Sequence, residues 1–321
     1  MHKLTTAIIL VICFFGLDLN IVFAAEGGGR PISLGGAFVA IADDVHAVSW
    51  NPAGMAWQEN SECTYAAILN NRDKYVTADL ISDDYFSFVQ PLKSGYERNF
   101  ANFGGMGFFV HNSGYDRNGV ETDLYHYGLA YGRKISSEEM AIGVSLTQYS
   151  FSAETNLLDA EDSAISINLG WLWYYSNSIS FGCLCENVFE PGYSLFGVKS
   201  RLFRVFRPAI AYYPNDRTTI SFDIYDLTGN TKNTGCDLSQ DIRVGIEHYL
   251  SDSVSIRVGA HHPNSKEDTV KFYSFGMGLQ RADFLGLKPI NYYLDYSFIY
   301  WQKSLSGMDK YTHQLGITIG F

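Results

Sequence analysis

Residues 311–321 read YTHQLGITIGF, and this stretch decides the class of fold. Every second residue is large or apolar, and the residues between them are polar or glycine. The first set is Tyr311, His313, Leu315, Ile317, Ile319 and Phe321. A period of two residues is typical of a β-strand with one apolar face. The stretch therefore predicts a strand that turns one face toward an apolar medium.

The same alternation returns along the chain from about residue 62. Clear examples are residues 165–173, 220–225, 254–261 and 290–300. Periodicity by itself allows a soluble β-sandwich as well as a membrane barrel, but the spacing of the strands favours the barrel. Read backwards from Phe321, long links (302–310, 262–269, 227–238, 187–203, 153–162) alternate with tight ones (251–252, 214–216, 176–177, 134–138), although 281–288 and 91–103 depart from the pattern. Short turns on one side and longer loops on the other are typical of outer-membrane barrels.

We expect an all-β fold, with residues 61–321 forming a single antiparallel transmembrane barrel of about 14 strands. The first two strands are expected near residues 62–69 and 84–90. Mean hydropathy is only -0.06, which suits a barrel because only alternate residues of each strand face lipid. The 22 Tyr and 22 Phe residues suit aromatic girdles at the two membrane interfaces. These features predict the outer membrane of a Gram-negative-type envelope.

The two ends of the chain resemble signals for export and for barrel assembly. Residues 1–25 resemble a secretory signal peptide, with Lys3 before an apolar stretch and small residues near Ala24 for cleavage. At the other end, the terminal aromatic Phe321 resembles the signal by which barrel-assembly machinery recognises a last strand. We therefore expect that machinery and outer-membrane lipid as partners.

Charge and motifs argue against several functions. The net charge of -11 is unsuited to a nucleic-acid binder, which needs a basic face. The sequence has no nucleophile elbow, no HExxH, no P-loop and no GxGxxG between a strand and a helix. His261 and His262 lack further converging ligands for a metal, and Cys183 and Cys185 stand at the limit of disulfide geometry. We expect no enzyme activity, no cofactor and no metal.

Residues 26–60 differ from the rest, because they are rich in small residues without a clean period of two. Gly35 and Gly36 permit close backbone approach, residues 37–42 could form a short helix, and the run Asn51-Pro52-Ala53-Gly54 has turn chemistry. A barrel of about 14 strands is too wide for wall side chains to fill. This segment is therefore expected to plug the lumen as a hatch.

Here the sequence resembles a known family. The run from Arg30 to Phe38, then Ala42-Asp43-Asp44, then the run from Trp50 to Ala56 resemble the N-terminus of the long-chain fatty-acid transporter (FadL-type) family, and most closely its PorV/PorQ-like members. The resemblance implies a 14-stranded barrel with an N-terminal hatch. In transporting members, apolar ligands pass through the lumen toward a lateral opening. PorV-like members instead serve protein secretion.

Three sets of candidate site residues follow. The hatch motif comprises Gly35, Gly36, Asp43, Asp44, Asn51, Pro52 and Gly54. The candidate lumen residues are Asp223, Arg243, Glu247, Arg257, His261 and Asp295, and Asp43 and Asp44 could pair with Arg243 or Arg257. An apolar, cation-rimmed link (Tyr193, Leu195, Phe196, Phe203, Arg204) suits an amphiphile or a partner protein, or else an anchor at the membrane surface.

The expected function is passive transport of hydrophobic small molecules, such as long-chain fatty acids, across the outer membrane. The alternative is a PorV-like, non-enzymatic component of a protein secretion or surface-assembly system, with an exported protein as its partner.

Overall fold

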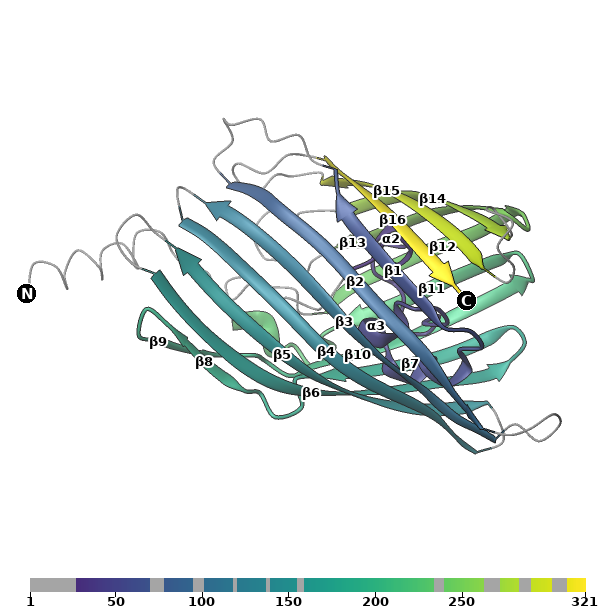
Figure 1. Cartoon of the computed structure of the whole chain (residues 1–321), viewed down its shortest axis with the longest axis horizontal. Helices are drawn as coiled ribbons and strands as arrows, with labels where there is room; N and C mark the ends of the chain where they lie inside the picture. The colour runs from purple at the N-terminus through teal and green to yellow at the C-terminus, as the bar shows by residue number, and fades with distance from the viewer. Residues whose placement is uncertain are drawn as a thin grey trace, which may run out of the picture.

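The computed structural model describes residues 27–69, 78–94, 101–117, 120–136, 139–154, 159–233, 240–262, 272–282, 290–301 and 311–321. Within these ranges, fourteen strands close into one barrel (Figure 1). They are β1 (Glu62–Ile68), β2 (Ala78–Ser94), β3 (Ala101–Arg117), β4 (Val120–Ser136), β5 (Met140–Glu154), β6 (Asp159–Ser176), β7 (Ile179–Glu186), β10 (Val205–Asn215), β11 (Thr218–Tyr225), β12 (Asp241–Ser251), β13 (Val254–His262), β14 (Phe272–Ala282), β15 (Asn291–Trp301) and β16 (Tyr311–Gly320). The expected signal peptide lies outside the described residues.

The barrel is closed by its first and last strands. β1 pairs with β16 in antiparallel register, for example Tyr65 opposite Ile317, and β1 also pairs with β2. A closed cylinder leaves no free sheet edge, which is the condition for placing strands in lipid. The prediction of about 14 strands in a barrel is confirmed, and the sandwich alternative is wrong.

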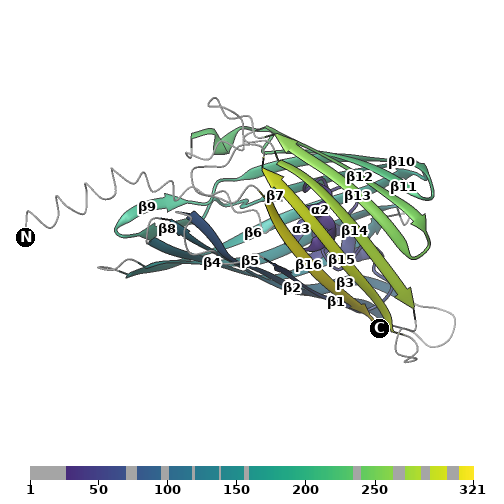
Figure 2. The ribbon, with the colours of Figure 1, turned by 90° about the horizontal axis from the view of Figure 1, so that it is seen from above.

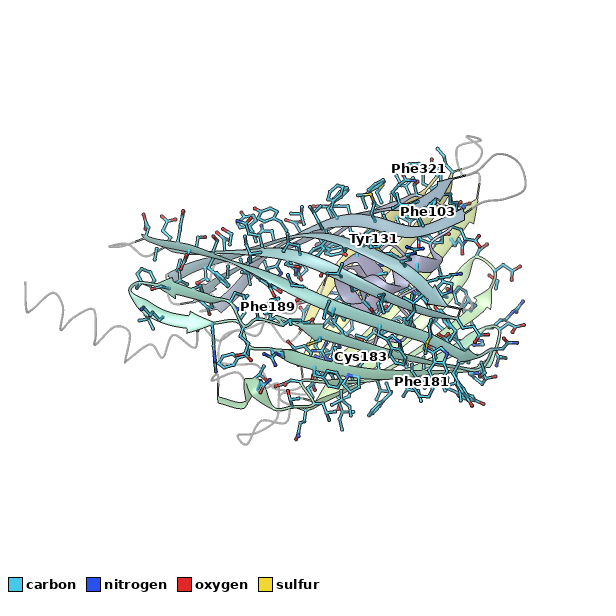
Figure 3. The ribbon with its side chains drawn as sticks, turned by 90° about the horizontal axis from the view of Figure 1, so that it is seen from below. Phe103, Tyr131, Phe181, Cys183, Phe189 and Phe321 are labelled. Carbon is cyan, nitrogen blue, oxygen red and sulfur yellow. The ribbon has the colours of Figure 1, made fainter. Side chains whose placement is uncertain are left out.

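The apolar face of the alternating strands points outward. In β16 the side chain of Leu315 is 47% exposed, whereas that of its neighbour Gln314 is 1% exposed. The labelled Tyr131, Phe181 and Cys183 likewise project away from the barrel in Figure 3. Large hydrophobic side chains are exposed all around the wall, including Leu129, Ile142, Val144, Leu146, Ile165, Leu169, Ile246, Val258, Met277, Leu294 and Ile317. An apolar surface of this extent far exceeds what a soluble monomer exposes.

The two ends of the barrel differ. At one end, the turn end, tight turns at 177–178, 216–217 and 252–253 join the strands, and Ser61 and Phe321 exchange backbone hydrogen bonds. The opposite end, the loop end, carries the long link 187–204. The link expected at residues 153–162 is in fact only 155–158, because β5 and β6 continue through the alternating polar residues on either side of it.

Strands β2 to β6 are much longer than the others, at 15 to 18 residues. On β5 the outward residues change from Leu146 to Gln148, and on β6 from Ile165 to Ser163 and Glu161. A membrane needs only about 10 residues of a tilted strand. The loop-end part of this long sheet is therefore polar outside and extends beyond the apolar belt.

Residues 27–58 lie inside the barrel, where α2 and α3 are surrounded by wall strands (Figure 2). The helices are α2 (Gly29–Ser33), α3 (Ala47–Trp50) and the 3-10 helix η1 (Pro52–Trp57), with a further 3-10 turn η2 (Asn230–Asn233) in a link. No helix in the described ranges is long and apolar enough to cross a membrane. We call residues 27–58 the inner segment.

Candidate functional site

The inner segment is buried among inward-facing wall residues. Its side chains Leu34, Phe38, Ile41, Val45, Trp50 and Met55 form one core cluster with wall residues that include Ala66, Tyr85, Val89, Phe109 and Leu184. The helix expected at residues 37–42 is absent. Wall side chains instead bind the backbone of these residues. Asp223 accepts hydrogen bonds from the N–H of Phe38 and from the N–H of Val39, at 3.1 Å each. Ser180 donates to the carbonyl of Ala40 at 2.7 Å.

Asn51 holds the next turn of the segment. Its side-chain oxygen accepts from the N–H of Ala53, and its amide donates to the carbonyls of Val39 (2.8 Å) and Trp171 (3.0 Å). Pro52 then begins η1, where a missing N–H costs nothing. Asn51 thus joins two stretches of the inner segment to strand β6 of the wall.

Glycines in the wall let the segment approach the strands backbone to backbone. A Cβ added at Gly143 would overlap the backbone of Pro52 and Ala53, and one at Gly259 would overlap that of Leu34 and Gly35. Similar contacts occur at Gly105, Gly132, Gly182 and Gly245. Glycine weakens a strand by roughly 0.5–1 kcal/mol relative to alanine. These six wall glycines all lie against the backbone of the inner segment. A larger residue at any of them would overlap that backbone, which is a steric reason for glycine at these positions.

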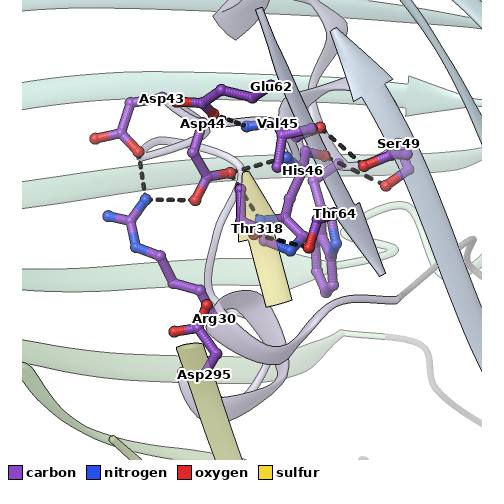
Figure 4. Close-up of polar contacts among 12 residues, drawn as sticks. Arg30, Asp43, Asp44, Val45, His46, Ser49, Glu62, Thr64, Asp295 and Thr318 are labelled. Carbon is purple, nitrogen blue, oxygen red and sulfur yellow. Dashed lines mark hydrogen bonds and ion pairs between the residues drawn. The ribbon is translucent and has the colours of Figure 1, made fainter. Parts of the chain in front are cut away.

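Arg30 is the centre of a chain of ion pairs between the inner segment and the wall. Its guanidinium contacts Asp43 at 2.5 Å, Asp44 at 2.8 Å and Glu247 of β12 at 2.8 Å. Glu247 continues to Arg257 at 2.6 Å, which contacts Asp295 at 2.5 Å. Figure 4 shows Arg30 between its two aspartates. The expectation that Asp43 and Asp44 pair with Arg243 or Arg257 is therefore wrong, because Arg30 is nearer to both in space and sequence.

A second set of ion pairs lies on β10 to β13. Arg207 contacts Asp223 at 3.2 Å and also donates to the carbonyl of Gly36. Arg243 contacts Asp241 at 3.2 Å, and Asp241 contacts His261 at 3.1 Å. Gly36 itself has a φ of 73° and Gly35 a φ of 64°, values that favour glycine.

All six residues proposed for the lumen point inward, and they lie on β11, β12, β13 and β15.

A polar cavity of about 260 Å³ lies between the chain of ion pairs centred on Arg30 and the turn end of the barrel. Its lining includes Arg30, Asp43, Asp44, His46, Glu62, Tyr249, Arg257, Tyr293 and Asp295. The apolar side chains gather elsewhere in the interior, around the inner segment and, on the β2–β6 side, toward the loop end.

On that side, aromatic rings and imidazoles form a continuous row. Tyr85, His111, His126 and Tyr149 are directly opposite one another across β2, β3, β4 and β5. Their ring centroids are 6.0, 5.5 and 4.6 Å apart in that order. At one end Tyr85 stacks on His46 of the inner segment, at 5.9 Å. We call these five residues the ring row.

At its other end the ring row meets the long link 187–204, which folds as a hairpin. The hairpin consists of β8 (Gly192–Leu195) and β9 (Val198–Arg201), which pair only with each other. Tyr193 and Leu195 are buried against the inward residues Leu124, Tyr149, Phe151 and Ala164. The apolar link predicted from the sequence thus turns the side that carries Tyr193 and Leu195 into the barrel mouth. Phe196 and Leu202 pack against the same cluster. Of the cations in the link, Arg201 lies over the ring of Phe203, and Arg204 lies near Glu190.

Sequence reasoning named Arg30 only as part of a motif, assigned Arg207 to the cations of the apolar link rather than to the interior, and missed the wall glycines and the ring row. A signal for the last two was present, because inward positions of successive strands carry Gly or a ring at similar depth. The register between strands, which the sequence does not contain, was needed to align them.

The described residues contain no group of three or more His, Cys, Asp or Glu side chains arranged to hold a metal. Cys183 and Cys185 carry free thiols and project from the outer wall, while Cys236 lies outside the described residues. The structure therefore adds no candidate for a metal or redox centre within those ranges.

No family model and no curated relative matches the sequence. Solved structures do match it over nearly their whole length. One is the CymD monoaromatic hydrocarbon channel, with a TM-score of 0.60 and 12% sequence identity, where the match covers 92% of this chain and 97% of that one. A Pseudomonas aeruginosa FadL homologue has a TM-score of 0.59 and 12% identity, with 91% of this chain and 96% of that one covered. The Ralstonia pickettii toluene transporter TbuX has a TM-score of 0.58 and 13% identity, with 92% of this chain and 98% of that one covered. At such low identity the likeness concerns the fold, and the chain shares the closed barrel architecture of these channels and transporters.

Proposed function

We propose that this protein is an outer-membrane channel through which neutral hydrophobic small molecules move passively. The ring row inside the barrel is the observation that carries the proposal. Its buried rings line the β2–β5 side of the interior from Tyr149, beside the hairpin, to His46 of the inner segment, and Asp83 binds His111 at 2.5 Å. The apolar outer belt supports the membrane location, and the fold shared with a toluene transporter and a monoaromatic hydrocarbon channel supports the kind of cargo.

The interior suits an uncharged cargo better than a long-chain carboxylate. A carboxylate leaving water needs a cation or several hydrogen-bond donors. The inward arginines of the described ranges, Arg30, Arg207, Arg243 and Arg257, each contact an aspartate or glutamate already. Fatty acids, the cargo expected from the sequence resemblance, remain a second candidate that the same assay tests.

The test is uptake by a Gram-negative host that lacks its own hydrophobic channels. We expect cells that express the chain to accumulate labelled naphthalene faster than cells with an empty vector, and to accumulate labelled oleate less readily. Uptake of a labelled sugar serves as a control for leakage and should be equal in both. Equal naphthalene and oleate uptake with and without the chain would contradict the proposal.

The PorV-like alternative predicts a different result. A protein that serves secretion should co-purify stoichiometrically with a large secretion barrel or an exported protein, and should transport no hydrocarbon. Purification from the native membrane therefore distinguishes the two functions.

A further inference from the structure

The hairpin β8–β9 places a ring of the chain itself onto the inner wall. Tyr193 stacks on Phe151 with 4.2 Å between the ring centroids and 16° between the ring planes (the hairpin is visible beside β5 and β6 in Figures 1 and 2). Phe151 in turn stacks on Tyr149 at 6.4 Å and 11°. Tyr149 belongs to the ring row, so Tyr193 occupies the loop-end continuation of the row.

The surroundings of Tyr193 form a site shaped for a planar apolar group. Leu124, Phe151 and Ala164 come from three neighbouring wall strands, and all of them are buried together with Tyr193 and Leu195. Stacked rings that are offset from each other are a favourable aromatic arrangement, and the planes of Tyr193 and Phe151 are nearly parallel. The site therefore provides one ring face for stacking and aliphatic side chains around it.

Hydrogen bonds hold the start of the link that carries the hairpin: the N–H of Val188 donates to the carbonyl of Ile167 at 3.0 Å, and the N–H of Asn187 donates to the side chain of Asn168 at 2.9 Å. The strands of the hairpin have four residues each and pair with no barrel strand, and an isolated hairpin is marginally stable in water. The N–H of Ser194 donates to Asp162 of β6 at 2.5 Å, and Asn187 donates to the carbonyl of Phe203 at 3.0 Å. Arg201 contacts Glu190 at 3.1 Å within the link itself. Beyond these bonds, the burial of Tyr193 and Leu195 packs the hairpin against the wall.

We infer that the wall around Phe151 is the entry site for a planar, neutral, ring-bearing molecule, and that Tyr193 occupies it as an internal substitute until such a molecule displaces the hairpin. This inference rests on the proposed function and adds to it an entry site and a regulating contact. A ligand and Tyr193 compete for one ring face, so the hairpin lowers the affinity measured for the ligand by the fraction of time that the site is open.

Naphthalene binding to the full chain, purified in detergent, tests the inference by the change in naphthalene fluorescence. Tyr193→Ala removes the competitor and should tighten binding about threefold to tenfold, the range expected from one aromatic pair. Tyr193→Phe keeps the ring and should bind as the unaltered protein does. Phe189→Ala is the matched control, because Phe189 lies in the same link but is 74% exposed.

Phe151→Ala removes the stacking face and should weaken naphthalene binding in both the Tyr193 and the Tyr193→Ala backgrounds. A heat-modifiable band on gel electrophoresis checks that each variant is a folded barrel. If a folded Tyr193→Ala protein binds naphthalene with unchanged or lower affinity, the inference is overturned while transport itself can still hold. If the unaltered protein neither binds nor takes up naphthalene, the proposed function fails with it.

Discussion

Arg30 of the inner segment lies 2.8 Å from Glu247 of β12, across 217 positions of sequence. Both side chains are almost fully buried, with 12% and 1% of their surfaces exposed. Glu247 is also bound to Arg257, so the contact connects Asp43 and Asp44 of the segment with three strands of the wall. This network, together with the backbone contacts at the wall glycines, fixes the segment inside the barrel.

Replacing Arg30 by methionine should destabilise the protein strongly. The variant keeps most of the side-chain volume but leaves Asp43, Asp44 and Glu247 without their shared cation. Removing one partner of a buried ion pair costs roughly 3–5 kcal/mol. The measurement is the free energy of unfolding in urea for protein in lipid vesicles. Arg217→Met is the control, because Arg217 is exposed and its contact with Asp252 is 3.6 Å, and a similar loss in both variants would show that the Arg30 network is unimportant.

Gly143→Ala should displace the inner segment. The new methyl group would overlap the backbone of Pro52 and Ala53, and neither backbone can move without breaking the turn that Asn51 holds. We expect faster proteolysis within residues 27–58 of the folded barrel. Gly316→Ala provides the comparison, because its nearest neighbour would be Ala66 Cβ at 3.5 Å, an ordinary contact. Equal protease resistance of the two variants would argue against close packing at Gly143.

Acid should weaken the attachment of the inner segment through Asp44. Burial alone would raise the pKa of Asp44, but His46 and Arg30 hold this pKa below its ordinary value. A carboxylate with a lowered pKa stabilises the folded state above its unfolded pKa of about 3.9, and this contribution disappears as the pH falls below that value. The difference in unfolding midpoint between the unaltered protein and Asp44→Asn should therefore be present at pH 5 and shrink as the pH falls below about 4. A difference that grows between pH 5 and pH 3 would contradict this assignment.

Charge on the outer face should be costly in proportion to its depth in the membrane. Leu315→Arg places a cation in the middle of the apolar belt and should cost about 2–4 kcal/mol, whereas Gln148→Arg, at the polar border of β5, should cost roughly 0–1 kcal/mol. Unfolding free energies in lipid vesicles measure both. Equal costs would mean that the belt does not face hydrocarbon.

Much of the fold could be predicted because β-alternation is local. The outward set of β16, from Tyr311 to Phe321, and the inward set Asp223, Arg257 and Asp295 follow from the period of two alone. Closure and the strand number followed from the spacing of turns. The long sheet β2–β6 was less predictable, because polar residues at the ends of β5 and β6 read as a loop although they continue the strands.

The site was less predictable because it depends on contacts distant in sequence. Arg30 takes the role expected of Arg243 or Arg257, since the path of the inner segment decides which cation the aspartates meet. The ring row needs the register that sets His111 opposite His126. Tyr193 was recognised as part of an apolar link, but its contact with Phe151 depends on the hairpin folding inward.

A structure of the purified protein with naphthalene tests the account most directly. The account predicts naphthalene inside the barrel, stacked on Phe151 in the place of the Tyr193 ring, with the hairpin moved out of the mouth. Naphthalene bound only on the outer belt, with Tyr193 still against Phe151 at saturating concentration, would contradict it.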